Sequence, residues 1–429
     1  MFICHFCYTA IALSLSTSLN LIRSSGKIFT IKISANMDVV RKLNFDKIFV
    51  IPITASYINR SNPNIRKDGK WAIQFTVGYA IFSLVSFTFI YNIICHDLKN
   101  NDFTHACKNC TLIVVYSVSS FQYFILITHR KTIVSLIAGV KNDYATSASE
   151  DQAIIRHYAV QAQWVCKQWL FITINGVLSF VVKSLALIFL SCWRGDCEKV
   201  TLHDVVYPKI IEDYKDSFLV YLILYLFQLY FGFQSSIMYM SFVPMGPIFM
   251  LHACGQLEIV KKRVDILFIG HRDEDIRRNL RKVVQHLQYI YGFVDKINEC
   301  FHIIYEFILM TTAIVLPVTV YEVLETFREG EISLEFLTFI VGGFLIIYSP
   351  CYYGDLLIEK GEEVRQAIYS SGWEKSKDLH MRSTLLLLLT RTQRPTAVQT
   401  MFRTINLETL TDILRHAYAI FNLINTMWE

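Results

Sequence analysis

Long stretches without a charged side chain constrain this chain more than any other feature of its sequence. A helix needs about 20 consecutive apolar residues to cross a hydrocarbon core that is about 30 Å thick. Six stretches are close to or beyond that length and contain at most one Asp, Glu, Lys or Arg, namely 71–96, 110–129, 168–193, 217–257, 300–321 and 336–354. Charged residues make up only 18% of the chain, against about 25% in a typical soluble domain. The sequence therefore predicts an all-α membrane protein.

The stretch at 217–257 is long enough to raise the question of two spans. Pro244, Gly246 and Pro247 interrupt it, and both residue types interrupt helices. The remaining stretch, 248–257, is too short to cross a membrane and contains His252. We therefore expect one span from about residue 217 to residue 241, followed by a segment on the cytoplasmic side.

A seventh and less apolar segment, 405–428, carries its polar residues on one face. Its charged residues, Glu408, Asp412 and Arg415, all lie in its first half. Spacings of four, three, four and three residues place five polar side chains on one helix face: Thr411, Arg415, Tyr418, Asn422 and Asn425. A spanning helix with one polar stripe faces water or partner helices rather than lipid. We expect seven transmembrane helices in all.

The distribution of Lys and Arg predicts the orientation of these helices. Of the 41 Lys and Arg residues, 31 lie in the N-terminal segment and the alternate loops on its side, whereas the opposite loops hold 7. Cytoplasmic loops carry the excess of positive charge in membrane proteins. The N-terminus should therefore be cytoplasmic and the C-terminus extracellular. This topology is inverted relative to that of G-protein-coupled receptors.

The first 22 residues contain no charged side chain, yet they lack the basic stretch with which a signal sequence begins. Two interpretations remain for this region. Either Met37 is the usual start and residues 1–36 are an extension, or the protein begins at Met1 and the stretch lies on or in the membrane.

The outer halves of spans two, three, four and six contain aromatic, aliphatic and hydroxyl side chains of the kinds that line small-molecule pockets. The candidate pocket residues are Tyr116, Ser119, Ser179, Phe180, Lys183, Ser184, Phe218, Tyr221, Leu222, Tyr225, Phe339 and Phe344. Aromatic residues in spans also serve as packing or interface residues. Lys183 lies near mid-membrane, where an unpaired ammonium is costly. It should anchor a ligand pocket or contact a neighbouring helix.

The predicted outer loops contain further candidates. Cys107, Cys110, Cys192 and Cys197 lie where disulfides are permitted, with no pairing fixed by the sequence. Asn109 begins a glycosylation sequon that abuts the second span. The loop between spans five and six is acidic, so it is either a solvated loop or a ring that attracts cations at a pore. Its carboxylates are Glu322, Glu325, Glu329, Glu331 and Glu335.

The sequence contains none of the standard enzyme motifs GxxxxGK[ST], GxGxxG, HExxH or GxSxG. Cys107 and Cys110 form a lone CxxC, which is weak evidence for a metal site. The net charge of +5 is scattered along the chain rather than gathered into a nucleic-acid footprint. We expect no enzymatic activity, no cofactor, no metal and no nucleic-acid partner.

The last third of the chain carries specific motifs. The sixth span runs into SPCYYGD at 349–355, followed by AIYSSGW at 367–373. RTQRP at 391–395 comes next, and NLET at 406–409 leads to AYAIFNL at 417–423. Together with the inverted seven-span topology, these motifs resemble the insect odorant receptor family, in particular its moth-type members.

This resemblance implies a ligand-gated, non-selective cation channel in the plasma membrane of olfactory neurons. Its partners would be a small volatile odorant or pheromone and the shared odorant co-receptor, joined with the chain in a heterotetramer. The helix at 385–394 would match the segment that holds subunits together. The last helix would line the pore, with Leu423 at the hydrophobic gate and the remaining pore residues at Arg415, Tyr418, Asn422, Asn425 and Thr426.

Two positions depart from the family pattern. Many members carry a glycine before the aromatic residue that precedes NLET, whereas this chain has Thr400-Met401-Phe402. Many also have a phenylalanine where this chain has Leu410. These differences concern the local bend and the coupling to the gate.

We therefore expect five regions along the chain. They are a cytoplasmic segment at 1–70, spans one to five with an outer ligand pocket at 71–321, the acidic outer loop and sixth span at 322–354, a cytoplasmic anchor region at 355–397, and the pore-lining seventh span at 398–429.

Three other classes remain as alternatives. A gustatory-type receptor would form homotetramers, but its usual Thr-Tyr-x-x-x-x-Gln-Phe ending is not found. A G-protein-coupled receptor would place its termini on the opposite sides. A transporter would be expected to show internal repeats or paired broken helices.

Overall fold

The computed structural model describes residues 46–428, apart from 101, 196–198, 216, 270–271, 329 and 331–332. Within these residues the chain is helical and forms no strand, and an isolated bridge pairs Gln399 with Thr404. The helices are α2 (Asp46–Ile58), α3 (Gly69–Asn92), η1 (Ile93–Asp97), α4 (Phe103–Thr128), α5 (Arg130–Thr146), α6 (Gln152–Arg194), α7 (Lys209–Glu212), α8 (Phe218–Phe242), α9 (Met245–Asp265), α10 (Asp273–Arg328), α11 (Leu334–Ser370), η2 (Trp373–Lys375), α12 (Leu379–Thr392) and α13 (Leu407–Trp428). The all-α prediction is confirmed. The choice between Met1 and Met37 concerns residues outside those described.

Six helical segments within the described residues are long and apolar enough to cross a membrane. They correspond to the first six predicted spans and include α3 with η1, α4, α6, α8 with α9, α10 and α11. The expected seventh span is α13, which has 22 residues. Glu408, Asp412 and Arg415 make α13 less apolar than the other six. The chain is a multi-pass membrane protein.

The break at Pro244 divides the long apolar stretch as predicted. Helix α8 ends at Phe242, and α9 begins at Met245. Proline lacks an N–H group and is tolerated in the first turn of a helix. Helix α9 is buried without interruption from Met245 to Leu257 and packs against α6, α10 and α11. The residues after the break therefore form a central packing helix.

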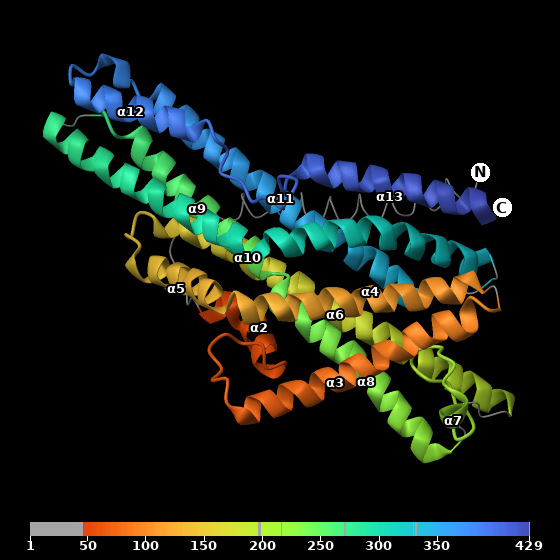
Figure 1. Cartoon of the computed structure of the whole chain (residues 1–429). Coiled ribbons are helices and arrows are strands. Elements are labelled where there is room, and N and C mark those ends of the chain that lie inside the picture. Colours follow the sequence, from red (N-terminus) through yellow and green to blue (C-terminus); the bar gives the residue numbers. More distant parts are fainter. Residues whose placement is uncertain are drawn as a thin grey trace. The chain divides into compact units, whose positions relative to one another are not determined.

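Several helices are much longer than a membrane is thick. Helix α10 has 56 residues, which corresponds to about 84 Å at the usual rise of an α-helix. Its first half buries a regular stripe at spacings of three and four residues, consisting of Ile276, Leu280, Val283, Leu287, Ile290 and Val294. Figure 1 shows α9, α12 and the beginning of α10 together at one end of the helical body, and α7 at the other end. One end is thus a packed helical extension, and the other holds the connection between α6 and α8.

Helix α13 packs against α10 and α11 (Figure 1). Leu410, Ile413 and Ala417 are buried on the packed side. Four members of the predicted stripe are exposed on the opposite side, namely Thr411, Arg415, Tyr418 and Asn422, and Leu423 is exposed beside them. The amphipathic pattern read from the sequence therefore describes the actual faces of this helix.

Gly354→Ala tests how tightly α11 packs against the segment that leads into α13. A Cβ atom at Gly354 would collide with the backbone carbonyl oxygen of Ile405, which cannot swing aside like a side chain. We expect a loss of about 1–3 kcal/mol, the usual cost of overpacking, measured as a lower melting temperature of the purified protein. The control is Gly292→Ala in α10, where a Cβ meets no atom within 4 Å. Alanine should stabilise that position by up to about 1 kcal/mol, and equal effects at both sites would contradict this description.

Candidate functional site: a cavity closed by a loop

A cavity of about 170 Å³ lies among α4, α6, α8, α10 and α11. Its wall is mostly aliphatic and aromatic, with Val115, Val177, Phe231, Ile308 and Phe339 contributed by the five helices in turn. Leu202 and His203, from the loop between α6 and α8, complete the lining. A largely apolar concave site with a few polar groups is typical of small-molecule binding.

Most hydroxyl groups around the cavity are bonded to their own helices. Thr311 donates to the carbonyl of Phe307 at 2.7 Å, and Thr319 donates to that of Val315 at 2.9 Å. Thr173 and Thr338 make the same kind of contact in α6 and α11. Such intrahelical bonds satisfy the hydroxyl, so these threonines contribute little free hydrogen-bonding capacity to the cavity.

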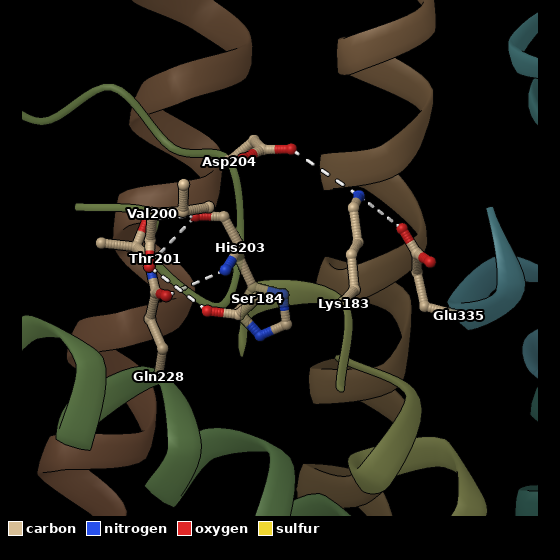
Figure 2. Close-up of polar contacts among 8 residues, drawn as sticks. All are labelled: Lys183, Ser184, Val200, Thr201, His203, Asp204, Gln228 and Glu335. Carbon is tan, nitrogen blue, oxygen red and sulfur yellow. Dashed lines mark hydrogen bonds and ion pairs between the residues drawn. The ribbon is translucent and has the colours of Figure 1, made fainter. Parts of the chain in front are cut away.

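The loop that closes the cavity is held by side chains of the surrounding helices. Gln228 of α8 accepts a hydrogen bond from the His203 N–H at 2.9 Å and donates to the His203 carbonyl at 3.3 Å. Ser184 and Tyr221 both donate to the carbonyl of Val200, at 3.2 and 3.0 Å. Figure 2 shows Thr201 and Gln228 beside His203, and hydrogen bonds engage both main-chain groups of His203. The loop is therefore a fixed part of the cavity wall.

The His203 side chain is 6% exposed and lies among aromatic rings. Its ring is 4.7 Å from that of Phe180, 5.4 Å from that of Phe89 and 6.1 Å from that of Phe231, each in an edge-to-face arrangement. Burial, assisted by the nearby Lys183 ammonium, lowers the pKa of His203 to about 3. The imidazole is consequently neutral at physiological pH.

Lys183 forms an ion pair with a residue of another helix. Its ammonium lies 2.6 Å from a carboxylate oxygen of Glu335 and 3.9 Å from one of Asp204 (Figure 2). The ion pair joins α6 to the start of α11 and to the closing loop. Lys183 does not belong to the described lining of the cavity. It acts as a helix contact beside the cavity rather than as part of its wall.

The other candidate pocket residues occupy several different positions. Phe180 and Phe339 line the cavity. Ser184 and Tyr221 hold the loop, Tyr116 is hydrogen-bonded to Ser83, and Ser179 bonds back to its own helix. Phe218 and Leu222 are exposed, whereas Ser119 is fully buried. Tyr225 packs against the buried cluster that includes Phe180 and Phe231, and Phe344 stacks on Tyr348. The sequence reading missed His203 and the contribution of α10, although Ile308, Thr312, Val315 and Thr319 share one helix face at the usual spacing.

The remaining candidates lie apart from the cavity. Cys107 and Cys110 are free thiols on neighbouring turns of α4, and Cys192 is disulfide-bonded. Asn109 is buried and donates to Asp97 at 2.8 Å. Helix α10 extends through Glu322 and Glu325, so the acidic segment is largely helical, and both Glu322 and Glu335 are buried. Cys197, Glu329 and Glu331 lie outside the described residues.

The described residues contain no cluster of three or more metal-binding side chains. The cavity is likewise lined by no Asp, Glu, Lys or Arg from this part of the chain. The arrangement is suited to holding a neutral, mainly apolar molecule.

Comparisons with known proteins give one consistent result. A family model described as 7tm Odorant receptor matches residues 102–418. Odorant receptor 85c of Drosophila melanogaster is 27% identical over 35% of this chain and 39% of its own length, so the chain spans about two fifths of that relative. Odorant receptor 85f of the same organism is 22% identical over 73% of this chain and 80% of its own length.

The fold also matches a solved structure. The insect olfactory receptor OR5 from Machilis hrabei, in complex with eugenol, superposes with a TM-score of 0.73 at 14% sequence identity. The match covers 89% of this chain and 97% of that receptor chain. At this identity the likeness concerns the fold.

Breaking the Lys183–Glu335 pair from one side should destabilise the protein more than removing both charges. Lys183→Met leaves the Glu335 carboxylate, which is 1% exposed, without its cation. Losing one partner of a fully buried pair costs about 3–5 kcal/mol, and we expect about 2 kcal/mol here because Lys183 is a third exposed. The double variant Lys183→Met with Glu335→Leu should recover part of that loss.

The measurement is the melting temperature of the purified single and double variants. Lys215→Met serves as the control, because Lys215 pairs with Glu212 within one surface turn. Strictly additive effects of the two substitutions would show that the ion pair contributes no coupling.

Proposed function

Because this chain belongs to the insect odorant receptor family, we propose that it is the odour-binding subunit of a non-selective cation channel. A small volatile molecule binds in the cavity, and binding favours the open state of a channel formed with the odorant co-receptor. The observation that carries this proposal is the largely apolar cavity of about 170 Å³ within the helical bundle. The Machilis receptor, solved with eugenol, supports small-molecule binding by this fold.

The charge distribution supports an orientation with the N-terminus in the cytoplasm and the C-terminus outside. The helical extension formed by α9, α12 and the first half of α10 then lies in the cytoplasm. The loop between α6 and α8 lies at the extracellular end, so the cavity belongs to the outer part of the membrane-spanning body. An odorant arriving from outside reaches the cavity near its closing loop.

Helix α13 is the proposed pore-lining element. Its exposed stripe, containing Arg415, Tyr418 and Asn422, has no partner face within the described part of the chain, and several charged or polar side chains facing lipid would be costly. In a tetramer, four such faces meet around a common axis. Leu423 then forms a hydrophobic constriction beside Asn422, Asn425 and Thr426, and such a constriction closes a pore by excluding water.

The proposed subunit contacts lie in the cytoplasmic extension. The leucine-rich part of α12 buries Leu385 and Leu388 but leaves Leu386 and Leu387 exposed. An apolar surface of this kind favours contact with another protein surface. We infer that this region holds the heterotetramer together.

Two helices connect the cavity to the proposed gate. Helices α10 and α11 line the cavity through Ile308 and Phe339, and both pack against α13. A ligand can change gating only through a difference in its affinity for the open and closed states. A rearrangement of α10 and α11 around the ligand would supply that difference.

The test is whole-cell current under voltage clamp, in cells expressing this chain with and without the odorant co-receptor and exposed to a broad panel of volatiles. We expect a fast cation current that requires the co-receptor and resists G-protein blockers. A current from this chain alone would instead indicate a homomeric channel. A C-terminal tag that antibodies reach only after permeabilisation would contradict the proposed topology.

Leu423→Ser should convert the hydrophobic constriction into a wettable one. We expect a ligand-free leak current or a changed relative permeability to Na⁺ and K⁺. Leu219→Ser is the matched control, because Leu219 is 66% exposed on α8 and Leu423 is 61% exposed on α13. Unaltered leak and selectivity in Leu423→Ser, at normal surface expression, would remove this residue from the gate.

A further inference from the structure

Among the polar side chains that line the cavity, His203 and Ser235 have buried polar atoms without a hydrogen-bond partner within the described part of the chain. Neither ring nitrogen of His203 makes a hydrogen bond, and neither does the hydroxyl of Ser235 on α8. Both residues are more than nine-tenths buried. A buried polar group left without a partner is destabilising, and it is uncommon in folded proteins. Because both residues line the cavity, a molecule bound there is an available source of the missing contacts.

We propose that the ligand is a neutral molecule with a hydroxyl group on an apolar body of about one ring, and that this hydroxyl forms a hydrogen bond with His203. The inference rests on the proposed function, because it names the chemical class of molecule that the same cavity takes.

The chemistry of the imidazole favours a hydroxyl over other polar groups. A neutral histidine has one N–H donor and one nitrogen acceptor. A hydroxyl can donate to one or accept from the other, whichever nitrogen faces it. A carbonyl can only accept, so it fits one of the two tautomers. A hydrocarbon leaves the His203 ring unsatisfied in an apolar site.

The ring is also held in place before any ligand binds. Gln228 fixes the main chain of His203 on both sides, and the rings of Phe89, Phe180 and Phe231 surround its imidazole. The imidazole has little freedom to turn towards another partner. A hydrogen-bonding group that is already ordered gains affinity at a low entropic cost.

The lining also restricts the charge and size of the ligand. With no Asp, Glu, Lys or Arg among the described lining residues, a carboxylate or ammonium ligand would lose its hydration without gaining an ion pair. The ammonium of Lys183, which acts electrostatically on His203, is already paired with Glu335. The volume of about 170 Å³ compares with the apolar cavity of about 150 Å³ that holds benzene. A single ring with a short substituent fits this space.

The test compares three probes with the same ring, namely benzyl alcohol, benzaldehyde and toluene. Whole-cell currents are recorded in cells that express this chain with the co-receptor. In the wild type, we expect half-maximal activation by benzyl alcohol at a concentration about tenfold below that for toluene, with benzaldehyde between them. In His203→Phe, benzyl alcohol should lose that advantage while toluene remains effective.

His203→Asn keeps donor and acceptor capacity through its NH₂ group and its carbonyl oxygen, and should retain part of the preference for the alcohol. His96→Phe is the matched control, because His96 lies on the same end of the bundle but does not line the cavity. It should respond like the wild type. A full preference for benzyl alcohol in His203→Phe, at normal surface labelling, would overturn the inference.

A second measurement separates this inference from the channel proposal. The melting temperature of the purified wild-type chain is compared with each probe present. A larger increase with benzyl alcohol than with toluene, lost in His203→Phe, supports the inference even where no current flows, and the channel proposal then fails. Equal shifts and equal currents for alcohol and hydrocarbon leave the channel proposal standing and overturn the inference. A lack of any shift and any current with all three probes also overturns it.

Discussion

The side-chain amide of Gln228 fixes the closing loop, and the form of the cavity depends on that contact. Gln228 is 1% exposed and uses its carbonyl oxygen and its NH₂ group on the main chain of His203, with a further bond from the NH₂ group to Tyr207 at 2.8 Å. A loop that enters an apolar bundle carries peptide groups whose burial is costly unless they are paired. Because one glutamine pairs both main-chain groups of His203, the loop can place an imidazole among phenylalanine rings.

The same constraint explains why Lys183 and Glu335 occur together. An ammonium or a carboxylate alone at this depth would be costly, whereas the pair joins α6 to α11. Glu335 precedes by one turn the stretch of α11 that lines the cavity with Phe339. The ion pair thus fixes the position of α11 at the end where the loop closes. Hydrogen bonds position the loop, and a charge pair positions the helix beside it.

Long continuous helices then link this end of the molecule to the other. Helix α10 lines the cavity through Ile308 and Thr319, contacts α13, and continues into the helical extension. Pro317 removes one backbone N–H donor within this stretch, but α10 continues through it as a single helix. This continuity is the physical basis on which occupancy of the cavity can influence the proposed gate.

The sequence predicted the spans well because their length and the break at Pro244 are local properties. It also predicted the exposed face of α13, since a period of three and four residues identifies a face without knowledge of its neighbours. The sequence could state that Lys183 needs a partner, but it could not select Glu335, which is 152 positions away. It missed His203 because a polar residue in a loop is ordinarily expected to face solvent.

These contacts also decide how the cavity could discriminate between ligands. Most threonines around it are satisfied by their own helices, whereas His203 and Ser235 are described lining residues whose buried, unpaired atoms favour a polar contact. Against the rest of the wall, one methylene more or less changes binding by about 1–3 kcal/mol, and selectivity there follows shape and size. A polar group of the wall discriminates more strongly between ligands. A ligand that cannot pair with it leaves a buried polar atom desolvated without a hydrogen bond, and this lowers the affinity. Such a cavity therefore tolerates variation in the apolar part of the ligand. It requires a matching polar group on the ligand at the place where the fixed loop and α8 meet.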